Sequence, residues 1–144
     1  MKGLMIEHGR VLDPASGFDA TADVYVADGR IQAIGTPPAG FQVESRMDAA
    51  GLWVIPGLVD IAARLREPGQ TRKGTVASET RAAVAGGITT VCCPPDTRPV
   101  IDNTSVVELI HRRAQEADAA RVVPLGALTQ ALEGELISEM AALK

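Results

Sequence analysis

A change in the pattern of apolar and polar residues at Pro56-Gly57 constrains the fold of this chain more than any other feature. From residue 58 onward, apolar segments of strand length alternate with helical segments, and loops separate the two. The predicted order is strand 58–65, helix 73–85, strand 88–93, helix 105–117, strand 121–128 and helix 133–143. Alternation of this kind is typical of parallel βαβ units, whose ligand-binding loops lie at the carboxyl ends of the strands. An α/β fold is therefore expected, with its function at those loops.

Turn and cap residues fix some of these boundaries. The first helix is closed by Gly86-Gly87, and the second has capping-box spacing between Ser105 and Glu108. Asn103-Thr104-Ser105 matches the glycosylation pattern, but we interpret it as a helix entry.

The first 56 residues have a different pattern. Apolar and polar residues alternate over short segments, and turn residues separate these segments. They predict a small domain of antiparallel strands. Asp28-Gly29 separates two such strands, and Asp-Gly suits the positive φ angles of a type I′ hairpin turn. About five strands are visible, which is too few to complete a sandwich, so residues 1–56 are expected to form half of one.

Residues 57–144 are expected to form part of a (β/α) barrel. A complete eightfold barrel takes about 250 residues, and the three βα units visible here cannot close one. Two explanations remain open. Either the chain is a truncated piece of a longer protein, or another polypeptide covers the open edges.

Composition excludes several classes of function. The 144 residues carry a net charge of −4 without a long run of one sign, so neither nucleic acid nor an anionic membrane is an expected partner. No stretch reaches the roughly 18 apolar residues of a membrane span, and a cytoplasmic protein is expected. With 3% aromatic residues, the core must be aliphatic.

Cysteines and histidines give no metal site. Cys92 and Cys93 are adjacent in a strand and point to opposite faces, so buried, reduced thiols are expected. His8 and His111 share no face with a cysteine or an acid at ligand spacing. Both histidines are expected at the surface.

Residues 56–70, PGLVDIAARLREPGQ, resemble the hallmark of dihydroorotases and related cyclic amidohydrolases. That hallmark reads Pro-Gly, an acidic residue, His-x-His and Leu-Arg-Glu-Pro-Gly. Further segments resemble the family in the same order: 9–14, 28–35, 85–91, 95–99 and 101–103. The resemblance covers essentially the whole chain and implies a small β domain followed by a barrel.

Two positions depart from the family at the metal site. Residues 60, 62, 64 and 66 of a strand share one face, which explains how His-x-His holds the catalytic zinc of active relatives. This chain has Ala62 and Arg64 there. Alanine has no donor atom, and a guanidinium has no lone pair and repels a cation. We therefore predict no metal, no catalytic residue and no hydrolase activity of the chain by itself, and we expect Arg64 to pair with a carboxylate.

Two further positions match the family's substrate-binding residues. Arg66 stands where the family's arginine holds the substrate carboxylate, and Asp96 replaces the family's asparagine. A carboxylate at 96 opposes an anionic substrate. For Arg66 we favour a salt bridge to Glu67 or a neighbouring acid over substrate binding. The family's bridging lysine, two further histidines and an aspartate belong to strands beyond Lys144.

The resemblance suggests a non-catalytic function. Family members without the metal histidines are structural companions of aspartate carbamoyltransferase in pyrimidine synthesis, so this enzyme is the expected partner, in a homo- or hetero-oligomer. The alternative is an active zinc-dependent cyclic amidohydrolase, acting as dihydroorotase, hydantoinase or allantoinase. A third interpretation is a stable fragment whose function belongs to a longer parent.

Overall fold

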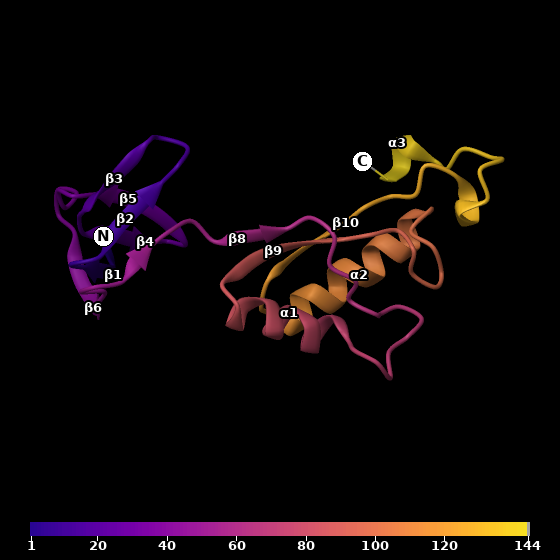
Figure 1. The fold of residues 1–144 in the computed structure, drawn as a ribbon, viewed down its shortest axis with the longest axis horizontal. Helices are drawn as coiled ribbons and strands as arrows, with labels where there is room; N and C mark the ends of the chain where they lie inside the picture. The colour runs from indigo at the N-terminus through magenta and orange to yellow at the C-terminus, as the bar shows by residue number, and fades with distance from the viewer. Residues whose placement is uncertain (144) are drawn as a thin grey trace. The chain divides into compact units, whose positions relative to one another are not determined.

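The computed structural model describes residues 1–143 and divides into two compact units, Met1–Pro56 and Gly57–Lys144 (Figure 1). The first unit contains strands, whereas the second combines strands with helices. The predicted mixed α/β class with a β-rich amino-terminal part is confirmed. Membership of the three βα units in a barrel stays a prediction.

The amino-terminal unit consists of two sheets, with strand orders β5-β4-β1-β6 and β3-β2-β7. The strands are β1 (Lys2–Glu7), β2 (Arg10–Asp13), β3 (Phe18–Thr21), β4 (Val24–Ala27), β5 (Arg30–Ile34), β6 (Gln42–Asp48) and β7 (Trp53–Val54). The expectation of antiparallel strands is correct for three pairings, but β1 with β6 and β2 with β7 pair in parallel. The unit has seven strands, whereas about five were expected from the sequence.

The hairpin between β4 and β5 turns at Asp28-Gly29 as predicted. Ala27 pairs with Arg30, and the two turn residues have φ angles of 52° and 68°. Positive φ at both central positions is the signature of a type I′ turn, whose twist matches that of the flanking strands.

The second unit contains a parallel sheet in the order β10-β9-β8. Its elements are β8 (Leu58–Asp60), α1 (Val76–Ala85), β9 (Ile88–Cys93), α2 (Thr104–Ala117), β10 (Arg121–Pro124), the 3-10 turn η1 (Gln130–Leu132) and α3 (Met140–Leu143). Helices α1 and α2 contact each other and lie on one side of the sheet (Figure 1). Among residues 1–143, no helix has the length and apolar character needed to cross a bilayer.

An aliphatic core lies between these helices and the sheet. The buried cluster consists of Leu65, Val76, Val91, Cys93, Ile101, Val106, Ile110 and Val122. Ile101 and Ile110 are completely buried. The core therefore fixes the strand ends from which the loops of the site depart.

Four element predictions were too long, and the first of them is helix 73–85, which begins only at Val76. Strand β8 ends at Asp60, because the Asp60 carboxylate accepts the backbone N–H of Ala62 at 2.9 Å and turns the chain. Residues 60, 62, 64 and 66 therefore do not share one strand face. The strand predicted over 121–128 likewise ends early, at Pro124. In the predicted helix 133–143 the chain turns at Gly134, which has a φ of +80°, and only Met140–Leu143 is helical.

The helix entries differ from the sequence pattern in detail. Helix α1 begins after Thr75, whose hydroxyl accepts the N–H of Ser78 in a capping box that was not predicted. Helix α2 begins after Asn103, whose side chain accepts the N–H of Val106 at 3.3 Å, so the predicted Ser105 capping box is wrong. The interpretation of Asn103 as a helix entry is confirmed. Gly86 ends α1, as expected.

Candidate functional site

The loops that follow β8 and β9 meet at the carboxyl edge of the parallel sheet. The N–H of Ala63 donates to the carbonyl of Cys92 at 3.0 Å, and the N–H of Arg98 donates to the carbonyl of Pro68 at 3.2 Å. Buried Leu65 anchors the first loop in the core. The two loops that carry the family motifs therefore form one surface.

Gly69 permits the closest approach between the two loops. Its φ is +108°, and a Cβ on it would lie 2.6 Å from the Cβ of Arg98 and 2.7 Å from the Arg98 carbonyl oxygen. No side chain fits in that space, and the backbone conformation also favours glycine. The Pro-Gly pair of the motif thus has a packing reason in this chain.

Arg64 and Asp96 form an ion pair across these loops. The Arg64 Nε donates to Asp96 Oδ2 at 2.7 Å, with side chains 57% and 44% exposed. The hydrogen bond to Asp96 raises the pKa of the Arg64 guanidinium, so Arg64 stays charged. The predicted pairing of Arg64 with a carboxylate is present.

The residues at this site do not fit a zinc ion. Ala62 is exposed and has no donor atom, and the cationic Arg64 already uses the Asp96 carboxylate. Over residues 1–143, no three histidine, cysteine or acidic side chains come close enough together to hold a metal. The side chains of the described residues therefore do not provide the ligands that a zinc ion needs.

A small cavity of about 80 Å³ lies beside the ion pair. Its lining includes Arg64, Arg66, Asp96, Cys93, Gln70 and Arg98. The structure thus brings together the two predicted substrate-binding positions, Arg66 and Asp96. The volume is well below the roughly 300 Å³ at which pockets for small organic ligands begin.

Arg66 does not form the salt bridge that was expected. The Glu67 carboxylate instead accepts the N–H of Val76 at 2.8 Å and lies 3.5 Å from the Arg113 Nε. Arg66 has a φ of +65°, its side chain is exposed, and it has no ion pair within residues 1–143. The prediction of an acidic neighbour for Arg66 is therefore wrong for the described residues.

The cysteines have structural positions. Cys93 is 1% exposed, Cys92 is half-buried, and both are free thiols, as expected. Burial raises the pKa of the Cys93 thiol, so it stays protonated near neutral pH. Cys93 therefore forms an inert wall of the small cavity.

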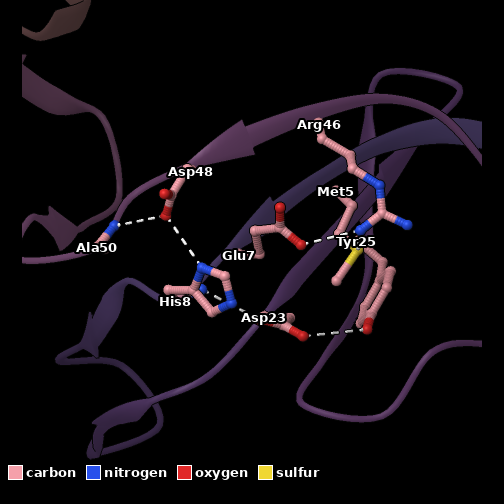
Figure 2. A network of polar contacts seen from close by, with 8 residues as sticks. All are labelled: Met5, Glu7, His8, Asp23, Tyr25, Arg46, Asp48 and Ala50. Atoms are coloured by element: carbon pink, nitrogen blue, oxygen red, sulfur yellow. Dashed lines mark hydrogen bonds and ion pairs between the residues drawn. The ribbon is translucent and has the colours of Figure 1, made fainter.

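His8 belongs to a polar network in the amino-terminal unit (Figure 2). It lies at the surface, as expected, but acids contact it, contrary to the sequence reasoning. The ring Nδ1 lies 3.0 Å from Asp48 Oδ1, and the backbone N–H of His8 donates to Asp23 Oδ1 at 3.2 Å. The hydrogen bond raises the pKa of His8 and lowers that of Asp48. These contacts depend on the positive φ of His8 after β1, which residue spacing in the sequence does not reveal.

Sequence reasoning also missed the basic residues around the loops. Arg72, Lys73 and Arg98 line a second cavity next to the Arg64–Asp96 pair. The available signal was the density of bases, because five of the 14 Lys and Arg residues lie within 64–73 and 94–99.

The fold is similar to that of solved hydantoinases. The structure of L-hydantoinase (dihydropyrimidinase) from Arthrobacter aurescens matches 90% of this chain and 28% of that chain, with a TM-score of 0.76 and 22% sequence identity. The family model described as dihydro-orotase-like matches residues 51–144, about two thirds of the chain. The chain belongs to the dihydro-orotase-like family.

Two curated relatives share much of the sequence. A dihydroorotase-like protein of Pseudomonas aeruginosa is 54% identical over 98% of this chain, which corresponds to 33% of that protein. A dihydroorotase of Trichlorobacter lovleyi is 44% identical over 98% of this chain and 33% of that protein. The chain thus spans about a third of the length of the curated relatives that it matches.

Proposed function

We propose that this protein is a non-catalytic dihydroorotase-like subunit of pyrimidine biosynthesis that binds aspartate carbamoyltransferase in the cytoplasm. The observation that carries the proposal is the Arg64–Asp96 ion pair, at 2.7 Å, on the loop where the family has a metal-binding histidine. The fixed positive charge of Arg64 takes the place of a metal ligand.

The chemistry of the two replaced positions supports the absence of catalysis. A catalytic zinc needs about three protein ligands with lone pairs and an open position for water. Ala62 offers none, and the guanidinium of Arg64 offers only donors. A zinc ion near Arg64 would also be repelled by the guanidinium, and the neighbouring carboxylate, Asp96, is already bound to the arginine.

The names of the relatives support the dihydroorotase-like family on which the proposal rests. The relative at 54% identity has the name dihydroorotase-like protein, and the one at 44% has the name dihydroorotase. The partner follows from the family resemblance, in which members without the histidines accompany aspartate carbamoyltransferase. Such a subunit would assemble into a hetero-oligomer with the transferase.

An active zinc-dependent cyclic amidohydrolase is the competing function. Arg66, at the family's substrate-binding position, remains free of an ion pair within residues 1–143 and lines the small cavity. For this function, another part of the protein or another chain would have to supply the metal ligands.

The catalytic question is tested by metal analysis and a dihydroorotase assay on the longest form of the protein that can be produced. We expect less than one zinc per ten chains and no turnover of dihydroorotate above a metal-free blank. The variant A62H/R64H removes the guanidinium and restores both imidazoles, whereas A62H alone leaves Arg64 in place as a matched control. Zinc uptake by the double variant, but not by the control, would assign the loss of metal to Arg64. Stoichiometric zinc and turnover in the natural protein would establish the active enzyme instead.

The partner question is tested by size-exclusion chromatography of the protein mixed with aspartate carbamoyltransferase at micromolar concentrations. We expect one co-migrating peak, and we expect A62H/R64H to co-migrate as well, because assembly does not use the metal site. Separate peaks at every ratio and salt concentration would contradict the proposed partner.

A further inference from the structure

A second cavity lies on the loops next to the Arg64–Asp96 pair. It has a volume of about 260 Å³, more than three times that of the first cavity. Its lining consists of Gly69, Gln70, Arg72, Lys73 and Arg98. Three of these five residues carry a positive charge, and none of them is acidic.

The three bases are not used in the structure of the loops. None of Arg72, Lys73 and Arg98 takes part in an ion pair among residues 1–143, in contrast to Arg64. The acids nearest along the chain are engaged elsewhere. Asp96 binds Arg64, and Glu67 accepts the N–H of Val76. Glu79 lies beside Gly74 and lines a different cavity. Since the protein as a whole has a net charge of −4, this concentration of positive charge is a local property of the two loops.

Backbone contacts hold these bases around one space. Arg98 is fixed to the first loop by its N–H bond to Pro68 and by its contact with Gly69. A turn positions Lys73, whose N–H donates to the carbonyl of Gln70 at 2.8 Å, and Gln70 donates in turn to the Arg66 carbonyl at 2.7 Å. The like charges are therefore held together by the fold, at an electrostatic cost that an anion would relieve.

The number of charges indicates the class of ligand. Three cations around one cavity exceed what a single carboxylate neutralises, whereas a phosphate group carries about −1.5 to −2 charges and several acceptor oxygens. An arginine fork binds two oxygens of such a group, and a lysine adds a point charge. The volume holds a group of that size, since a water molecule occupies about 30 Å³ of liquid.

We propose that Arg72, Lys73 and Arg98 form a binding site for a phosphate group, either inorganic phosphate or the phosphate of a small metabolite. The site does not include Arg64, Ala62 or Asp96, although Gln70 and Arg98 line both cavities. The proposal does not depend on whether the protein is catalytic or which subunit it binds.

The test is calorimetric titration of the protein with inorganic phosphate at constant ionic strength and pH 7.5. We expect saturable binding with one site per chain, and binding at least about tenfold weaker in R98Q and in K73Q, because each loses a charge-assisted hydrogen bond. R112Q removes an exposed base on α2 that lies outside the cavity and has no ion pair among the described residues. This control is expected to bind phosphate like the natural protein.

Further ligands distinguish the sources and the chemistry. Tighter binding of ribose 5-phosphate than of phosphate would assign a phosphorylated metabolite, and equal binding would assign the free ion. Three results would overturn the proposal: no saturable phosphate binding, equal weakening in R98Q, K73Q and R112Q, or tighter binding of the dicarboxylate succinate than of phosphate. Circular dichroism of each variant checks that its fold is intact.

Discussion

The two units of the chain are stabilised in different ways. In Gly57–Lys144, a cluster of large aliphatic side chains lies between the helices and the sheet. In Met1–Pro56, the buried hydrophobic residues are fewer, and ion pairs connect the strands. These pairs are Arg10–Asp19 between β2 and β3, Arg46–Glu7 between β6 and β1, and His8–Asp48 between the end of β1 and β6.

This difference shows which charges are available for binding. In the amino-terminal unit, cross-strand pairs help to specify the strand register, so their charges are neutralised within the sheet. In the second unit the aliphatic core fixes the elements, and bases on the loops can stay unpaired. Unpaired bases on a rigid support are therefore better candidates for ligand binding than the larger number of paired charges.

The largest expected effect concerns the core of the second unit. Replacement of Ile110 by alanine removes a completely buried side chain and is expected to lower the free energy of unfolding by about 2–5 kcal/mol. Urea unfolding followed by circular dichroism measures this change. L128A truncates a side chain that is 66% exposed and should change stability by less than about 0.5 kcal/mol. Equal losses in both variants would contradict the assignment of the core.

A smaller effect is expected where the two loops meet. G69A adds a Cβ only 2.6 Å from that of Arg98 and also requires an unfavourable φ, for a combined loss of about 2–4 kcal/mol. G87A is the matched control, since Gly87 has a φ of +81° but no atom within 4 Å of its Cβ position. Its loss should be limited to about 1–2 kcal/mol. Urea unfolding of both variants isolates the contribution of the loop contact.

A still smaller effect is expected at the start of α1, where an uncharged hydrogen bond caps the helix in the second unit. T75A removes the hydroxyl that caps the helix and should cost about 1 kcal/mol, whereas T75S keeps the oxygen and should restore most of the stability. Thermal unfolding measures both. Because no charge is involved, the loss should be the same in low and high salt, and a strong salt dependence would count against the cap.

The smallest effect is expected at His8, and it depends on pH. The raised pKa of His8 means that its stabilising contribution is complete below about pH 6.5 and is lost as the pH rises through the folded-state value. The lowered pKa of Asp48 means that its contribution is lost as the pH falls below its ordinary value of about 3.9. In H8N, which tolerates the same backbone angle, the deficit in melting temperature should be largest between about pH 4 and 6.5 and smallest at pH 9. A deficit that does not vary with pH would refute this role.

The sequence predicted those parts of the fold that depend on local chemistry. Asp28-Gly29 specifies its turn through the φ angles that these residues tolerate, and Gly86 ends its helix for a similar reason. Where a side chain competes with regular structure, the prediction was wrong. The Asp60 carboxylate ends β8 within two residues of the metal motif, and periodicity alone cannot show that.

For the candidate site, the sequence predicted that Arg64 pairs with a carboxylate, but it did not predict the other contacts around that pair. Arg64 was expected to find a carboxylate, and its partner Asp96 comes from the neighbouring loop. The partner of Glu67 is Arg113 on α2, 46 positions along the chain, so the expected bridge to Arg66 does not form. Contacts between distant segments of this kind depend on the packing of α2 against the sheet, which residue spacing does not reveal.

The central position of β9 has a consequence for the motion of the site. This strand pairs on both sides, with β8 and with β10, and its Val91 and Cys93 side chains are buried. In deuterated water its amide hydrogens should be among the slowest of the second unit to exchange, because they become exposed only when the sheet opens. The loop with Asp96 and Arg98 begins at the end of this strand, so slow exchange in β9 would mean that the loop is attached to the most stable part of the sheet.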